Sequence, residues 1–449
     1  MNKTHLYDTK PKKEKAFLVG VEFYNNNHEL GIDESLEELE LLADTAGLFV
    51  VGCEQQKLSA PNPATFIGTG KVEEIKVLVE ELNVDIIIFD EELSPRNFRE
   101  LEKEFGVKTR VIDRTTLILD IFAQHAQTHE GRLQVELAQY EYLLPRLTRA
   151  WSHLARQAGG GAGRSGSVGG VGLRGPGETQ LEVDRRQIRD RISRLKNEIE
   201  KVREHRSRYR QKRRNSNIPV VALVGYTNAG KSTLINSLTK ADVYVADQLF
   251  ATLDPTTRRW ELPGGNAVLI SDTVGFIQKL PTHLVAAFRA TLEEIAEADL
   301  LLHIVDASHP DAVQQWRSVM NTLKDLHADT IPMITVLNKI DQVNDQGDSL
   351  KQMIPEFSKG ILVSALLKTN IGEIENIVKQ SLFENYVPIE VTIPYKSGDL
   401  ISTFREYGKI DRIAHGIGEV NISGRIPGRL LADFERFKSR KSHIIKGKD

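Results

Sequence analysis

The sequence has a single cysteine, no long hydrophobic run and no large excess of charge of one sign. With only one cysteine, Cys53, the chain cannot form an intrachain disulfide or a metal site built from several thiolates. Because Cys53 lies in an apolar strand, we expect it in the core. No apolar run approaches the roughly 18 residues of a membrane-spanning helix, so we expect no membrane association. The first residues, MNKTHLYDTKPKKEKAF, are not followed by the apolar stretch of a secretory signal, so we expect a cytoplasmic protein.

What is present is a chain of 449 residues, of which 40% are hydrophobic and 27% are charged. At about 100–200 residues per domain, this length suggests two to four domains. The net charge of -3 hides a basic segment, because residues 185–214 hold fourteen Lys and Arg against four Asp and Glu. This excess of ten positive charges predicts contact with nucleic acid; a solvated helix face is the alternative.

Glycine is concentrated in one segment, since ten of the 33 glycines lie in residues 159–177. This segment has almost no large apolar residues and predicts a flexible loop. Apolar residues follow a heptad pattern on both sides of it, at Leu133, Leu137, Tyr140, Leu144, Leu147, Trp151 and Leu154, and at Ile188, Ile192, Leu195, Ile199 and Val202. The pattern predicts an antiparallel helical hairpin, with helices near 131–156 and 185–214. The alternative is that both helices lie flat on a globular domain and the loop is a linker.

Strand and helix patterns alternate along 15–130 and again along 218–385, which is typical of parallel α/β domains. The tail reads as a strand, a helix, two strands and a helix. We therefore expect a multidomain α/β protein with a parallel N-terminal domain, a helical arm, a doubly wound nucleotide-binding domain with a mostly parallel sheet, and a small α+β domain. The expected boundaries are 1–130, 131–216, 217–387 and 388–449.

The strongest motif is a phosphate-binding loop of the form G-x-x-x-x-G-K-[ST], which follows an apolar strand and opens a helix. Its residues are Gly225, Tyr226, Thr227, Asn228, Ala229, Gly230, Lys231 and Ser232. The glycines let backbone N–H groups converge on phosphates, and the helix N-terminus adds its positive dipole end. We expect Lys231 to reach the β and γ phosphates and Ser232 to supply one Mg²⁺ ligand.

A second motif, Asn338, Lys339, Ile340 and Asp341, closes another apolar strand and predicts selection of guanine. The Asp341 carboxylate can accept two hydrogen bonds from the N1–H and N2–H₂ edge of guanine, a pair of donors that adenine lacks. A carboxylate left without donors costs several kcal/mol, so the discrimination is large. After the next strand, Ser364, Ala365 and Leu366 are placed to turn a backbone N–H toward the guanine O6.

Two segments between these motifs are candidates for the metal and the γ phosphate. The first comprises Phe250, Ala251, Thr252, Leu253 and Asp254, and the second Asp272, Thr273, Val274 and Gly275. Thr252 offers the second hydroxyl ligand of Mg²⁺, Asp272 belongs to its outer shell, and the Gly275 N–H can sense the γ phosphate. The order and spacing of all four motifs predict a GTPase domain that binds GTP and GDP with Mg²⁺.

Several segments together resemble the HflX family of bacterial GTPases over nearly the whole chain. They are FIGTGKVEEI (66–75), LQVELAQYEYLLPRL (133–147), the arm with its glycine-rich loop, FATLDPTTR (250–258) and DTVGF (272–276). The resemblance implies binding to the large (50S) ribosomal subunit and its rRNA, and GTP-dependent splitting of stalled ribosomes under stress. It also implies ATP binding by the N-terminal domain and, for some members, RNA unwinding. We expect a ribosome-associated monomer.

The residue after Gly275 bears on catalysis. Many GTPases have a glutamine there that orients the attacking water, whereas Phe276 cannot hydrogen-bond to water. The catalytic residue is therefore unknown; Lys231, Thr252 and Gly275 contribute, and we expect slow hydrolysis without help from a partner, another loop or a cation. Asn228 resembles the asparagine of potassium-activated GTPases, which makes K⁺ a candidate; a turn-forming asparagine is the alternative.

Three functions remain open from the sequence: ribosome remodelling coupled to GTP hydrolysis, a GTP-gated RNA-binding factor for large-subunit assembly or hibernation, and ATP-dependent rRNA unwinding. Asp341 and the absence of separate helicase motifs favour the first two. The glycine-rich segment Gly68–Lys71 precedes a helix but lacks the spacing of a phosphate loop. A plain turn is the better interpretation, with an anion site for RNA or ATP as the alternative.

Overall fold

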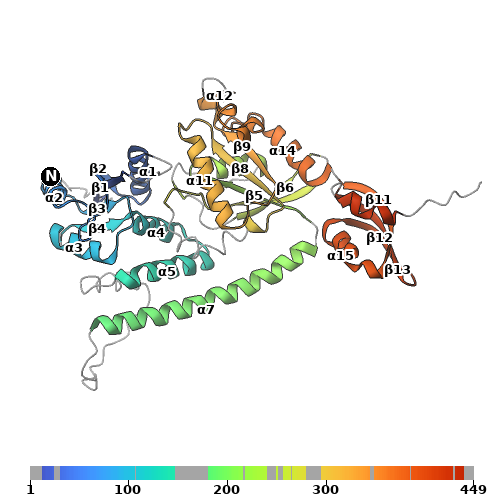
Figure 1. The fold of residues 1–449 in the computed structure, drawn as a ribbon, viewed down its shortest axis with the longest axis horizontal. Coiled ribbons are helices and arrows are strands. Elements are labelled where there is room, and N and C mark those ends of the chain that lie inside the picture. The colour runs from blue at the N-terminus through green and yellow to red at the C-terminus, as the bar shows by residue number, and fades with distance from the viewer. Residues whose placement is uncertain are drawn as a thin grey trace, which may run out of the picture.

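In the computed structural model, the described residues form three β-sheets, which follow one another along the chain (Figure 1). It describes residues 13–24, 31–106, 108–146, 180–215, 218–239, 249–250, 256–263, 265–279, 295–343, 348–384, 386–427 and 430–438. The expected multidomain α/β architecture is confirmed in these residues. None of the helices they form is long and apolar enough to cross a membrane.

The N-terminal sheet is parallel, with the strand order β2-β1-β3-β4. Its elements are β1 (Lys15–Phe23), α1 (Ile32–Thr45), β2 (Phe49–Leu58), α2 (Thr69–Leu82), β3 (Ile86–Phe89), α3 (Pro95–Phe105), β4 (Arg110–Asp113) and α4 (Arg114–His125). Apolar side chains on one face of the sheet pack with α1 and α4, and those on the other face with α2 and α3. Both faces are therefore buried, which explains the continuous apolar run of β3.

Two expectations for this domain can be checked directly. Cys53 is exposed rather than in the core, because β2 is an edge strand and alternate residues of it face solvent. The Lys71 ammonium lies 2.6 Å from Glu54 and 3.0 Å from Glu74, so protein carboxylates already pair with its charge. This arrangement favours the plain turn before α2 over an anion site.

The helical arm consists of α5 (His129–Leu143), a short 3₁₀ turn η1 (Leu144–Arg146) and the long α7 (Gln180–Asn215). Figure 1 shows α5 and α7 side by side, and Leu133, Leu137, Leu195 and Ile199 form their shared apolar seam. Arg191 makes a paired hydrogen bond to Glu136 across it, at 2.8 Å for each bond. Another face of α5 packs into the N-terminal core, so the described part of the hairpin lies against that domain. Residues 147–156 and the segment 159–177 lie outside the described residues.

The third unit has a six-stranded sheet of order β10-β9-β8-β5-β7-β6, in which β6 alone is antiparallel. Its elements are β5 (Val220–Gly225), α8 (Lys231–Thr239), β6 (Thr256–Glu261), β7 (Ala267–Asp272), β8 (Leu300–Asp306), α11 (Ala312–Asp325), β9 (Met333–Asn338), η3 (Ile340–Gln342), α12 (Asp348–Lys351), α13 (Pro355–Ser358), β10 (Ile361–Leu362), α14 (Ile371–Lys379) and η4 (Gln380–Glu384). The phosphate loop, the segment that begins with Asp272, the Asn338 motif and the segment that begins with Ser364 each lie at the carboxyl end of a parallel strand, where such sheets bind ligands.

The C-terminal unit has an antiparallel sheet of order β11-β13-β12. Its elements are β11 (Tyr386–Pro394), η5 (Tyr395–Ser397), α15 (Gly398–Tyr407), β12 (Lys409–His415), β13 (Glu419–Pro427), α16 (Leu431–Phe434) and η7 (Glu435–Phe437). Phe404 of α15 packs edge-on against Phe434 of α16 in its small core. The predicted order of strand, helix, two strands and helix is confirmed.

A single hydrophobic cluster connects the N-terminal and nucleotide-binding domains. Phe250 packs edge-on against Phe122 of α4, with ring centres 4.6 Å apart, and the Leu249 amide donates to the Thr45 hydroxyl at 3.3 Å. Tyr226, Val274 and Phe276 belong to the same cluster. The phosphate loop, Phe250 and the segment after β7 therefore adjoin the N-terminal domain.

Candidate nucleotide-binding site

The phosphate loop leaves β5 with a conformation that only glycine allows at two positions. Gly225 has a φ of 156°, and a Cβ there would lie 2.3 Å from the Ile304 carbonyl oxygen. Gly230 has a φ of 90°, and its Cβ would lie 2.3 Å from the side-chain nitrogen of Asn338. Asn228 also has a positive φ, 58°, which asparagine tolerates better than most residues. The Ile304 backbone and the Asn338 side chain therefore restrict these two positions to glycine.

Lys231 is buried at the start of α8, with its ammonium directed at the loop. The ammonium donates to the Gly225 carbonyl at 3.0 Å and to the Tyr226 carbonyl at 2.7 Å. Burial lowers the pKa of Lys231 to about 8, and the nearby charge of Asp272 opposes this shift. A phosphate group supplies stronger, charged acceptors than these two carbonyls, so the side chain is prepared for an anion.

The residues proposed for Mg²⁺ are partly brought together. The Ser232 hydroxyl donates to the Asp272 carboxylate at 2.8 Å, and Asp272 is only 1% exposed at the end of β7. A hydroxyl beside a carboxylate fits Mg²⁺, which takes oxygen ligands and shares them with phosphates and water. Thr252, with Ala251, Leu253 and Asp254, lies outside the described residues.

The base-recognition motifs meet the phosphate loop through one buried amide. The Asn338 side chain donates to the Ala229 carbonyl at 2.9 Å and accepts from the Ala365 amide at 3.0 Å. Lys339 has a positive φ of 63°, and its ammonium lies 2.7 Å from Asp306. Asp306 was missed from the sequence, although it ends the apolar strand β8 at the same edge of the sheet.

The remaining predicted residues divide by exposure. Asp341 in η3 and Leu366 are exposed, the latter at 69%, so a base can reach both side chains. Ser364 is buried, and its hydroxyl accepts from the Leu367 amide at 3.0 Å, which shapes the loop after β10. Thr273 is buried beneath the site and donates to the Leu223 carbonyl.

Phe276 and Phe250 face the interior. Their exposures are 2% and 3%, and both belong to the cluster shared with the N-terminal domain. The Phe276 side chain is therefore directed into the core. Its backbone pairs with the phosphate loop, because the Thr227 amide donates to the Phe276 carbonyl at 2.7 Å.

Comparison with known proteins agrees with this geometry. Family profiles match residues 33–123 as "GTP-binding GTPase N-terminal", 125–213 as "GTP-binding GTPase Middle Region" and 220–339 as "50S ribosome-binding GTPase". The "GTPase HflX" of Alkalihalophilus pseudofirmus is 48% identical over 434 residues, which cover 96% of this chain and 97% of that protein. The chain belongs to the HflX family of GTPases. It is therefore a GTP hydrolase that binds GTP and GDP.

Other relatives of this HflX chain extend the comparison. The "GTPase HflX" of Escherichia coli K12 is 40% identical, with 98% of this chain and 99% of that protein covered. A solved GTP-binding protein from Sulfolobus solfataricus, in complex with GDP, is 25% identical; the match covers 82% of this chain and 98% of that one, with a TM-score of 0.42.

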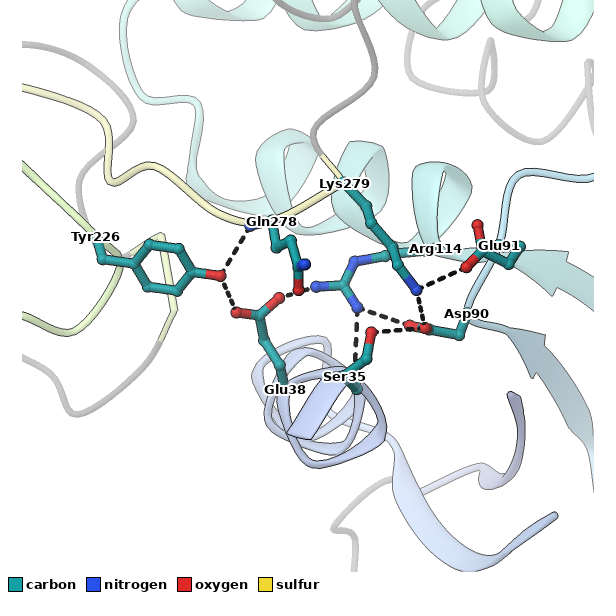
Figure 2. Close-up of polar contacts among 8 residues, drawn as sticks. All are labelled: Ser35, Glu38, Asp90, Glu91, Arg114, Tyr226, Gln278 and Lys279. Atoms are coloured by element: carbon teal, nitrogen blue, oxygen red, sulfur yellow. Dashed lines mark hydrogen bonds and ion pairs between the residues drawn. The ribbon is translucent and has the colours of Figure 1, made fainter. Parts of the chain in front are cut away.

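A set of N-terminal side chains that the sequence did not predict reaches the nucleotide site of this HflX chain. Glu38 of α1 hydrogen-bonds the Tyr226 hydroxyl, and Asp90, directly after β3, pairs with Lys279 (Figure 2). The available signal was the position of Asp90 at the carboxyl end of a buried parallel strand. Nothing in the sequence indicated its partner in another domain.

Proposed function

We propose that this HflX GTPase binds the large ribosomal subunit and couples GTP binding and hydrolysis to the splitting and recycling of stalled ribosomes under stress. The observation that carries the proposal is the exposed basic side of α7, a 36-residue helix that is followed in the chain by β5, the strand before the phosphate loop. The family profile over 220–339, described as a 50S ribosome-binding GTPase, supports the choice of the large subunit.

The basic side of α7 is distinct from its packed side. Ile188, Leu195 and Ile199 are buried against the arm and the N-terminal domain. Arg189, Arg194 and Lys201 are exposed and, within the described part of the chain, form no ion pair. Such side chains are available to neutralise RNA phosphates, and the release of counterions then contributes to affinity.

Within the proposed catalytic site, the described residues have positions that fit the following roles. Lys231 binds the β and γ phosphates, Asn338 positions the phosphate loop against the loop after β10, and Asp341 accepts from guanine. Ser232 and Thr252 are the proposed Mg²⁺ ligands; the bound ion supplies charge stabilisation at the phosphates. Because Phe276 is directed into the core, the group that orients the attacking water must come from outside this segment.

A sedimentation assay tests the proposal. Purified protein with GTP is added to intact ribosomes, and the fraction converted to subunits is measured on gradients. Conversion that requires GTP supports splitting; co-sedimentation without conversion would instead indicate a GTP-gated assembly or hibernation factor. Conversion with ATP alone would favour the unwinding activity.

Charge reversal tests whether α7 forms the contact with the large subunit. The triple variant with Arg189, Arg194 and Lys201 changed to Glu should lose subunit binding while retaining GTP binding. The matched control changes Lys108, Lys324 and Lys359, which are exposed on other elements, to Glu. Equal loss of subunit binding in both variants would show that net charge alone matters and would remove α7 from the interface.

A further inference from the structure

Residues 275–279 lie directly on the phosphate loop. The Thr227 amide donates to the Phe276 carbonyl at 2.7 Å, and the Phe276 amide donates to the Gly225 carbonyl at 3.1 Å. A Cβ placed on Gly275 would lie 2.8 Å from the Thr227 side chain and 3.0 Å from the Lys231 ammonium. Residues 275–279 therefore occupy space beside the Lys231 ammonium that a bound γ phosphate would also need.

Two side chains connect this arrangement to the N-terminal domain. The Tyr226 hydroxyl accepts from the Gln278 amide at 2.8 Å and also hydrogen-bonds Glu38. The Lys279 ammonium lies 2.7 Å from Glu91 and also pairs with Asp90. Figure 2 shows Glu38 and Asp90 approaching from the N-terminal domain, while Tyr226, Gln278 and Lys279 approach from the nucleotide-binding domain.

On the N-terminal side of this network, Glu38 and Asp90 have further buried partners. Arg114 is 2% exposed and pairs with Asp90 at 2.7 Å and with Glu38. The Ser35 hydroxyl donates to Asp90 at 2.7 Å. Because buried charges must keep their partners, these carboxylates cannot follow residues 275–279 if that segment moves.

The backbone of Lys279 supports the same interpretation. Its φ of 55° lies in the left-handed region, which a residue with a Cβ rarely adopts. Such a conformation persists where surrounding contacts determine it, and among the described residues Asp90 and Glu91 form ion pairs with Lys279.

We propose that Tyr226 and Lys279 set the preference between GTP and GDP, because through them the N-terminal domain holds residues 275–279 on the phosphate loop. GDP leaves this arrangement intact. A γ phosphate requires the Lys231 ammonium and the Gly275 amide, so residues 275–279 must shift, and the contacts to Glu38, Asp90 and Glu91 break. The intact contacts therefore lower the affinity for GTP more than the affinity for GDP.

The test measures affinities of the full-length protein for fluorescent GDP and for a fluorescent, non-hydrolysable GTP analogue. The Lys279→Met variant keeps the chain length and removes the charge; Tyr226→Phe removes only the hydroxyl. Each should raise the affinity for the GTP analogue relative to GDP by about tenfold, the size of one charge-assisted hydrogen bond. For Lys279→Met, which lies outside the phosphate loop, the GDP affinity itself should stay nearly unchanged. Lys279→Arg should keep the parent ratio, because it retains the pair with the carboxylates.

Lys57→Met is the matched control, since it removes an exposed lysine that pairs with Glu22 within the N-terminal domain. An unchanged ratio of GTP-analogue affinity to GDP affinity in Lys279→Met would overturn the proposal. So would a fall in the ratio, which would mean that the contact stabilises the triphosphate state instead. Hydrogen exchange of the parent protein gives a test without mutation: the Thr227, Phe276 and Gln278 amides should exchange faster with the GTP analogue than with GDP. Equal protection in the two states would also overturn the proposal.

Discussion

The Asn338 side chain joins the phosphate loop to Ala365, donating to the Ala229 carbonyl at 2.9 Å and accepting from the Ala365 amide at 3.0 Å. Asn338 is 2% exposed, so this link is protected from water. It fixes the distance between the phosphate-binding and base-binding parts of the site before any nucleotide arrives. Such preorganisation lowers the entropic cost of binding.

Guanine selection gives the first prediction. Asp341→Asn should weaken GTP binding by about 100-fold or more, because the amide cannot accept both hydrogen bonds from the guanine edge. The variant should prefer xanthosine nucleotides, which offer a carbonyl where guanine has an amino group. Competition against a fluorescent nucleotide measures both effects. Asp325→Asn, at the exposed end of α11, is the control; unchanged GTP affinity in Asp341→Asn would contradict the assignment.

The nucleotide site was largely predictable because its determinants are local. Gly225 and Gly230 are required by the backbone at those positions, and Lys231 and Ser232 follow in the same turn. Asp272 and Asn338 each end a strand of the parallel sheet, so topology brings them to one edge. Pattern and spacing contain all of this information.

The domain contact was not predictable, because it depends on pairs far apart in the sequence. Glu38 and Tyr226 are separated by 188 residues, and Asp90 and Lys279 by 189. The sequence predicts that Phe276 cannot hydrogen-bond to water, but its burial against the N-terminal core follows only from the assembled fold. Likewise, the apolar neighbours of Cys53 predicted a core position, whereas its exposure follows from the edge position of β2.

The buried Lys231 predicts a pH dependence of nucleotide binding. Its pKa in the free protein is lowered to about 8, whereas bound phosphates favour the charged form and raise it again. Below pH 8 the lysine is charged in both states, so affinity should be flat. Above pH 8 binding takes up a proton, and GDP affinity should fall by about tenfold per pH unit.

Titration of GDP between pH 6.5 and 9 checks this, together with calorimetry in two buffers to count the proton. Lys231→Arg is the control, because arginine stays charged over this range. The GDP affinity of this variant should not depend on pH, even if the affinity itself is lower. The ionisation of guanine is common to both proteins and cancels in the comparison. A parent affinity that is constant up to pH 9 would contradict the shifted pKa.

Hydrolysis should be slow in the free protein and rise strongly with large ribosomal subunits, because Phe276 is buried and cannot orient water. Single-turnover rates with and without subunits measure this. A fast intrinsic rate without stimulation would show that the site is already complete.

The effect of K⁺ on hydrolysis is a separate prediction. If Asn228 contributes to a K⁺ site, K⁺ in place of Na⁺ should raise the hydrolysis rate, and Asn228→Ala should remove that difference. Asn228→Gly is the informative control, since it keeps the positive φ of 58° without a side-chain oxygen. If Asn228→Gly keeps the K⁺ effect, the asparagine serves only the turn.

The glycine-rich segment 159–177 gives the last prediction. We expect it to enter a confined RNA site in the large subunit, because glycines fit close to RNA where side chains clash. Arg164 and Arg174 are available there for phosphates. Replacing 159–177 with a tight turn should spare GTP binding, since the phosphate loop lies in another domain. This replacement should abolish ribosome splitting. It should weaken subunit binding less than charge reversal on α7 does. The contribution of α7 to subunit binding should fall steeply with salt concentration. Splitting at the parent rate by the shortened protein would mean that the segment is only a linker between α5 and α7.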